Sequence, residues 1–117
     1  FGRDADGTLI YEADGYFSVQ LMQRDRPKFA SGDIQNGTVD EISSAYTGYI
    51  AYYGTYVVDE AEGVMTHQVR GSLFPNWVSE DQRRYFKLSG SQLTLSTPPT
   101  PFGGQELTAL LIWERAR

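Results

Sequence analysis

The chain has 117 residues, of which 40% are hydrophobic and 21% charged, so we expect one globular domain over residues 1–117 rather than a disordered chain. The net charge of −5 argues against a nucleic-acid partner and against an anionic membrane, because both require a basic surface. Cysteine is absent, which excludes disulfides, thiolate nucleophiles and cysteine-based metal sites.

The first part of the chain predicts a β-hairpin followed by a loop. Residues 1–7 have the composition of a turn that leads directly into a strand over residues 8–12, and an Asp-Gly turn joins this strand to a second one over residues 16–22. A turn needs two arms, so we expect that a first strand, before the turn, is missing. Residues 23–37 contain proline and glycine without periodicity and predict a surface loop long enough to act as a lid.

A capping box predicts where a single short helix begins. Thr38 and Glu41 have the spacing at which the threonine hydroxyl accepts from the third backbone N–H while the glutamate carboxylate reaches back. Apolar residues recur at helical spacing after this point, so we expect a helix over residues 39–52. Gly48 weakens this helix locally.

The rest of the chain predicts short strands separated by turns. Period-two alternation returns after Gly54, and the strands are expected at residues 55–59, 64–70, 82–89, 92–97 and 106–114. Residues 98–104, rich in proline and glycine, predict a loop. Seven short strands and one helix favour an all-β, antiparallel up-and-down barrel, with a sandwich as the alternative. An eighth strand, the missing first one, would close a small barrel able to hold one ligand.

The strand expected at residues 82–89 indicates a cavity. Alternation places Gln82, Arg84, Phe86 and Leu88 on one face, and the apolar pair makes this the buried face. The side chains of Gln82 and Arg84 therefore point inward, where each must find a partner or water. The simplest arrangement is a cavity with a polar entrance, at Gln82 and Arg84, and an apolar base, at Phe86 and Leu88.

Arg84 allows two interpretations. With Gln82 it could clamp a carboxylate or an enolate, because a guanidinium group presents a fork of donors that matches two oxygens. It could equally form an ion pair with an internal acid such as Asp59 or Glu60. Aromatic side chains could line the same pocket and stack on a planar ligand: Tyr11, Tyr16, Tyr53, Tyr56 and Trp77. Ordinary core packing is the alternative role for them.

The single histidine also has two possible roles. His67 lies in the middle of a predicted strand and is expected to point inward, where an imidazole could act as a general acid or base. Arg84 is the other candidate for a catalytic role. In the alternative interpretation, His67 is a buried structural residue that hydrogen-bonds the segment around Asn76 and Trp77.

Neither a metal nor a cofactor is expected. One histidine and no cysteine leave only carboxylates, and these lack the spacing of a calcium loop. Phosphate-binding glycine motifs and a Gly-x-Ser-x-Gly nucleophile elbow are absent from the sequence. With no apolar run long enough to span a bilayer and no apolar leader, we expect a cytoplasmic protein.

Several stretches resemble the lipocalin-like domain family of bacteria and fungi: Tyr11-Glu-Ala-Asp-Gly-Tyr-Phe-Ser-Val-Gln-Leu21, Tyr53-Gly-Thr-Tyr56, His67-Gln-Val-Arg-Gly-Ser-Leu-Phe-Pro-Asn-Trp77 and Leu93-Thr-Leu-Ser-Thr97. The resemblance implies a small calycin-type β-barrel with an internal pocket. Members of this family usually begin with a strand carrying a Gly-Thr-Trp-like motif, which this sequence lacks. The family includes carriers and a few cyclases of natural-product pathways.

Three hypotheses about function follow. The first is binding of a small hydrophobic or aromatic molecule, with contacts from Tyr11, Tyr16, Tyr56, His67, Asn76, Trp77, Gln82 and Arg84. The second is a cyclase or isomerase in which His67 or Arg84 stabilises developing charge. The third is a structural module with a filled interior that forms a homodimer through the open edge of its sheet.

Overall fold

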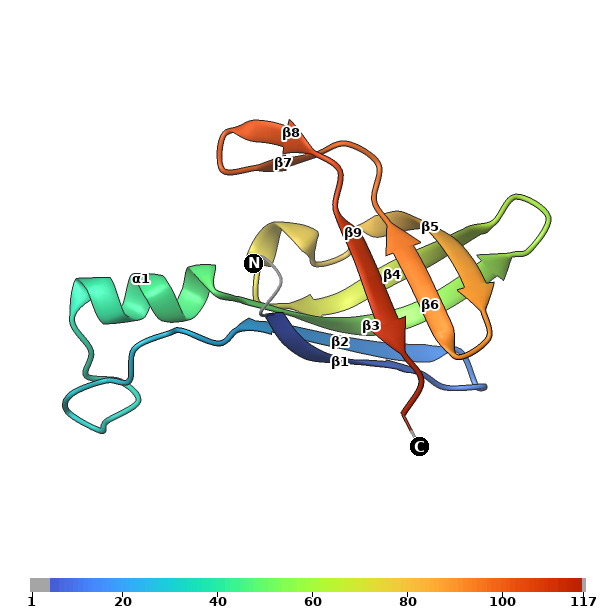
Figure 1. The fold of residues 1–117 in the computed structure, drawn as a ribbon. Helices are drawn as coiled ribbons and strands as arrows, with labels where there is room; N and C mark the ends of the chain where they lie inside the picture. Colours follow the sequence, from blue (N-terminus) through green and yellow to red (C-terminus); the bar gives the residue numbers. More distant parts are fainter. Residues whose placement is uncertain (1–4, 117) are drawn as a thin grey trace.

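The computed structural model describes residues 5–116 and shows an antiparallel, nearly closed β-barrel (Figure 1). Each strand of its sheet pairs with the next in the order β1 (Ala5–Tyr11), β2 (Tyr16–Gln23), β3 (Tyr49–Asp59), β4 (Val64–Ser72), β5 (Asp81–Ser89), β6 (Gln92–Ser96) and β9 (Leu110–Glu114). The predicted all-β barrel is confirmed, and the sandwich alternative is wrong. Of the turn predicted over residues 1–7, residues 5–7 already belong to β1, and residues 1–4 lie outside the described range.

The helix α1 (Val39–Thr47) begins where the capping box predicts. The backbone N–H of Glu41 donates to the Thr38 hydroxyl at 3.1 Å, and the Thr38 N–H donates to the Glu41 carboxylate at 2.8 Å. The predicted extension to residue 52 is wrong. Gly48 caps the helix, and Tyr49 starts β3 opposite Met22. The aromatic residues after Gly48 fit both a helical and an alternating pattern, and pairing with β2 selects the strand.

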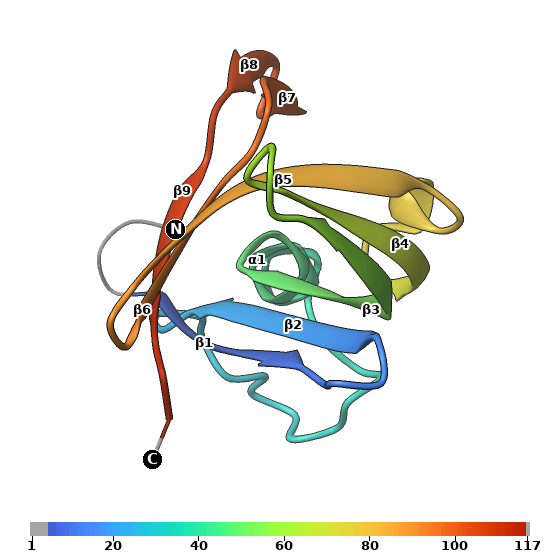
Figure 2. The same cartoon turned by 90° about the vertical axis from the view of Figure 1, so that its right-hand side faces the viewer.

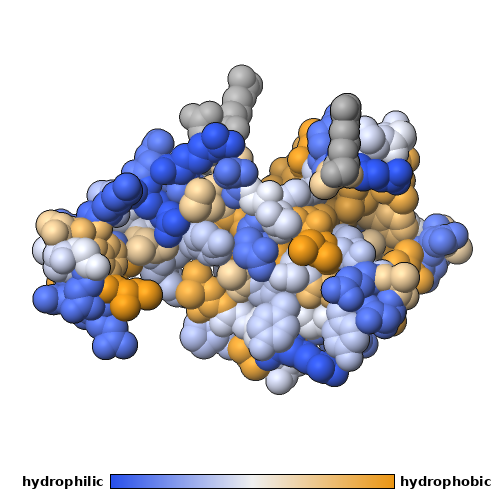
Figure 3. Space-filling model, turned by 90° about the horizontal axis from the view of Figure 1, so that it is seen from below, coloured by the Kyte–Doolittle hydropathy of each residue, from blue (hydrophilic) through white to orange (hydrophobic). Residues whose placement is uncertain are grey.

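The position of α1 leaves its apolar side chains uncovered. The helix projects from one end of the barrel and contains no buried residue (Figure 1). Val39, Ile42 and Tyr46 share one face and are all exposed. Seen from below, apolar side chains appear on the α1 side of the molecule as well as over the strands (Figure 3). Only the C-terminal end of the helix reaches the barrel.

The C-terminal segment differs from the prediction of one loop and one long strand. A small hairpin, β7 (Thr100–Phe102) and β8 (Gln105–Leu107), precedes β9 and stands away from the barrel (Figure 1). Gly103 and Gly104 have φ values of 61° and 81°, which allow the tight two-residue turn between these strands. The prolines beside this turn gave the segment its loop-like composition.

The barrel core is formed by alternate residues of the central strands. Phe17, Val19, Tyr52 and Val69 form its buried cluster. A β-bulge interrupts the β3–β4 pairing between Tyr53 and Gly54. Figure 2 looks along the barrel, with α1 seen end-on and with β9 and β4 on opposite walls. The short helix η1 (Pro75–Trp77) follows β4 and packs Trp77 against the core cluster.

Candidate functional site

His67 is buried in the barrel interior. Its side chain is fully buried, with 0% exposure, in agreement with the predicted inward direction. The Phe17 ring stacks on the imidazole with a centroid separation of 4.2 Å and an interplanar angle of 13°. Phe17 comes from β2 and His67 from β4, and the residue of β3 that pairs with Phe17 is Gly54. Because Gly54 has no side chain, the two rings meet across the intervening strand.

Two tyrosine hydroxyls complete the surroundings of the imidazole. The Tyr11 hydroxyl lies 2.6 Å from Nε2, and the Tyr52 hydroxyl lies 3.5 Å from Nδ1. A neutral imidazole has one donor and one acceptor nitrogen, so one hydroxyl donates to the ring and the other accepts from it. The hydroxyl that accepts keeps its own proton available for a further partner. The predicted bond from His67 to the segment around Asn76 is replaced by these two tyrosines.

The groups of this cluster are held neutral. Burial, together with the nearby Arg84 guanidinium, lowers the pKa of His67 to about 3. Burial raises the pKa of Tyr11 and of Tyr52, and the positive charge of Arg84 opposes the shift at both hydroxyls. At neutral pH the interior therefore presents an uncharged imidazole and two uncharged phenols beside one guanidinium group.

Arg84 and Gln82 point inward from β5, as their alternation predicts. Both side chains are partly buried, and the guanidinium group donates to the side-chain oxygen of Gln82 and, at 2.9 Å, to the carbonyl oxygen of Arg83. Among residues 5–116, the structure contains one ion pair, which lies on the surface between Arg24 and Asp6. Arg84 therefore has no acidic partner within that range, and its predicted pairing with Asp59 or Glu60 is not observed.

One residue of the predicted inward face is exposed. Leu88 pairs with Leu93 and so keeps the inward face, but it is 67% exposed because it sits near the end of β5, beside the turn to β6. Its neighbour Phe86, two residues earlier, is partly buried and keeps the predicted direction. The apolar base of the predicted cavity is therefore shorter than the alternation of the sequence indicates.

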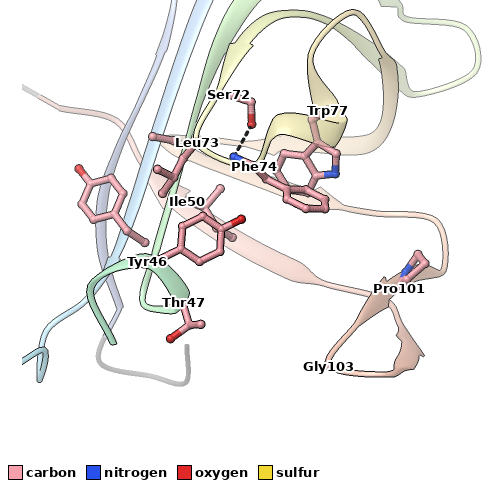
Figure 4. Close-up of a pocket in the computed structure, with 11 residues that line it drawn as sticks. Tyr46, Thr47, Ile50, Ser72, Leu73, Phe74, Trp77, Pro101 and Gly103 are labelled. Atoms are coloured by element: carbon pink, nitrogen blue, oxygen red, sulfur yellow. Dashed lines mark hydrogen bonds between the residues drawn. The ribbon is translucent and has the colours of Figure 1, made fainter. Parts of the chain in front are cut away.

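A cavity of about 270 Å³ opens at the end of the barrel where α1 begins to project. Its wall comes from the end of α1, the start of β3, the end of β4, η1 and the β7–β8 hairpin (Figure 4); the residues are Tyr46, Thr47, Tyr49, Ile50, Ala51, Ser72, Leu73, Phe74, Trp77, Pro101 and Gly103. The wall is mainly apolar and carries two aromatic rings from one turn, since Phe74 and Trp77 pack edge to face at 5.4 Å.

Trp77 and Tyr52 connect the cavity to the polar cluster. The Trp77 indole forms part of the cavity wall, and the Tyr52 ring packs edge-on against it with a centroid separation of 5.3 Å. The hydroxyl of the same Tyr52 faces His67. An apolar chamber with an uncharged hydrogen-bonding group behind its wall suits a small aromatic molecule that carries oxygen.

The structure brings some of the predicted ligand-binding residues together and separates others. Tyr56 packs edge-on against Tyr11 at 4.8 Å and donates its hydroxyl to the Glu12 carbonyl oxygen at 2.7 Å, so it supports the cluster from one side. Tyr16 is 47% exposed, and its ring lies 5.8 Å from the Arg70 guanidinium carbon on the outside of the barrel. Asn76 is exposed on η1 and is not part of the cavity wall.

Tyr52 and Phe17 were not among the predicted site residues. Both are buried around His67, and both lie in segments whose aromatic content is ordinary for a strand. The signal that could have found Tyr52 was its alternation with Ile50 and Gly54, which the helical spacing of the neighbouring tyrosines concealed. Within residues 5–116, no group of three or more His, Cys, Asp or Glu side chains could hold a metal ion.

Comparison with known proteins establishes the family. The model of the lipocalin-like domain family matches residues 1–116. The chain belongs to this family. A relative of this lipocalin-like chain is a 4'-hydroxy-3'-methoxypropiophenone carrier protein of Aspergillus oryzae, 30% identical over 105 residues, which cover 84% of this chain and 95% of the relative. No solved structure matches the chain significantly.

The family agrees with the antiparallel barrel described above. Small barrels of this kind are wide enough to hold one small ligand. None of the helices in residues 5–116 has the length and apolar character needed to cross a membrane.

Proposed function

We propose that this lipocalin-like protein is a carrier that binds a small aromatic molecule bearing hydroxyl or carbonyl oxygen. The observation that carries the proposal is the sequence of contacts from the apolar cavity through Trp77 and Tyr52 to the neutral imidazole of His67. The aromatic ring of the ligand lies against Trp77 and Phe74, and its oxygen is directed toward the Tyr52 hydroxyl. The Aspergillus oryzae relative is named as a carrier of an aryl ketone, which supports this class of ligand.

The electrostatics of the site favour binding over acid–base catalysis. An effective general base has a pKa near the working pH, whereas burial holds the pKa of His67 at about 3. Its two ring nitrogens are also occupied by the hydroxyls of Tyr11 and Tyr52. The imidazole therefore positions hydroxyl groups rather than moving protons at neutral pH.

Calorimetric titration with 4'-hydroxy-3'-methoxypropiophenone tests the proposal. We expect saturable binding with one site, and we expect Tyr52→Phe to weaken it about tenfold because it removes one hydrogen bond. Tyr53→Phe is the matched control, since Tyr53 is the next residue of β3 but is 57% exposed on the outer face. Absence of binding to the unmodified protein would contradict the proposal.

Mass spectrometry of the probe after prolonged incubation separates a carrier from a cyclase or isomerase. A carrier returns the probe with an unchanged mass and an unchanged chromatographic retention time. Conversion that depends on His67 or Arg84 would overturn the carrier assignment and support catalysis at the same site.

A further inference from the structure

The indole of Trp113 contains a buried donor that has no hydrogen-bond partner within residues 5–116. In the described part of the chain, every other buried side-chain nitrogen or oxygen has a hydrogen-bond partner, whereas the Trp113 Nε1 atom has none. Trp113 lies on β9, where Leu110 and Ile112 are 64% and 62% exposed while Leu111 and Trp113 are partly buried. Strand alternation therefore directs the Trp113 indole into the barrel.

Such a donor is costly unless an acceptor reaches it. A buried donor without a partner destabilises a protein by about 1–3 kcal/mol, and native structures pair almost all such groups. A buried water molecule is a poor candidate here, because it needs two to four polar partners of its own. The inward residues beside Trp113 on β6 and β9 are Leu93, Leu95 and Leu111, which offer none.

A single donor among leucines fits a mainly apolar molecule that brings one acceptor atom. Such a molecule buries its hydrocarbon part against the leucines and places an oxygen on the indole N–H. The position of β9 relates this donor to the polar cluster on β4. In the sheet order, β9 lies three strands beyond β4, and Figure 2 shows these two strands on opposite walls of the barrel.

We propose that Trp113 is a second polar recognition point, whose indole N–H donates a hydrogen bond to a carbonyl, ether or phenol oxygen of the bound molecule. This inference rests on the proposed carrier function and narrows its ligand class. The ligand is an aromatic compound with oxygen at two ends, one end directed toward Tyr52 and the other toward Trp113. A carboxylate is disfavoured at the Trp113 end, because one indole donor among leucines cannot compensate for the burial of a full charge.

Heteronuclear NMR of the indole N–H groups tests this assignment in the full chain. The sequence contains two tryptophans, so two indole resonances are expected, and Trp77→Phe assigns both. Titration with 4'-hydroxy-3'-methoxypropiophenone should move the Trp113 resonance downfield, as a newly formed hydrogen bond does. Binding that shifts the Trp77 resonance and leaves that of Trp113 unchanged would overturn the inference while leaving the carrier function intact.

Affinity measurements give an independent readout. Trp113→Phe keeps an aromatic ring but removes the donor, and we expect it to weaken binding of the probe about tenfold. Ile112→Thr is the matched control, because Ile112 is the adjacent β9 residue and faces outward. Equal affinity of Trp113→Phe and the unmodified protein would refute the hydrogen bond. No detectable binding to the unmodified protein would instead refute both the carrier function and the role of Trp113.

Discussion

Acidification should destabilise this protein through its single histidine. The pKa of His67 is about 3 in the folded state, whereas an exposed histidine in the unfolded chain has a pKa of about 6.5. Between these values the unfolded chain binds one more proton than the folded protein, so the free energy of unfolding falls as the pH falls below about 6.5. Each pH unit in this window costs about 1.4 kcal/mol, which amounts to about 2 kcal/mol at pH 5.

Urea unfolding of the native protein and of His67→Gln, each at neutral pH and at pH 5, measures this effect. The carboxylates contribute to the pH dependence of both proteins, so the difference between the two slopes isolates the histidine. We expect the native protein to lose about 2 kcal/mol more than the variant. If the variant does not fold, NMR of the His67 ring in the native protein gives the same information. An imidazole that titrates near pH 6.5 in the folded state would refute the reasoning.

Three further substitutions test other parts of the fold by urea unfolding. Tyr11→Phe removes the hydroxyl at Nε2 of His67 and should cost about 1–3 kcal/mol, because a buried nitrogen loses its partner; an unchanged stability would show that this contact is unimportant. Gly54→Ala places a Cβ against the carbonyl oxygen of Gln68 at the bulge and should cost about 1–3 kcal/mol, and a neutral effect would contradict the close approach of β3 and β4 there. Thr38→Ala removes the cap of α1 and should cost about 1 kcal/mol, with loss of helical signal in circular dichroism as the second readout.

The fold was largely predictable because most segments carry one dominant pattern. The hairpins have an alternating pattern with a turn residue between their strands, and the capping box placed the start of α1 correctly. Prediction failed over residues 48–52, where tyrosines and isoleucine fit a helix face and a strand equally well. Hydrogen bonding to β2 decides that competition, and it depends on residues about 30 positions earlier in the chain.

The directions of single side chains were also predictable, since alternation along β4 and β5 correctly directed His67, Gln82 and Arg84 inward. The partners of those side chains were not. The stacking of Phe17 on His67 depends on the register of three strands and on a glycine in the middle one, and none of these is local information. The same limit applies to Trp113, whose inward direction follows from alternation but whose lack of a partner is a property of the assembled barrel.

The two ends of the proposed ligand site differ in whether their hydrogen-bonding group already has a partner in the protein. On the wall of β4, His67 is satisfied by two hydroxyls, so the imidazole fixes their orientation and leaves one hydroxyl proton free. On the wall of β9, the Trp113 donor has no hydrogen-bond partner among residues 5–116. A ligand that accepts a hydrogen bond at both walls gains from a preoriented hydroxyl at the first and removes an existing penalty at the second. Loss of the Trp113 donor should therefore reduce affinity and, because the orphaned group is removed, raise the stability of the protein without ligand.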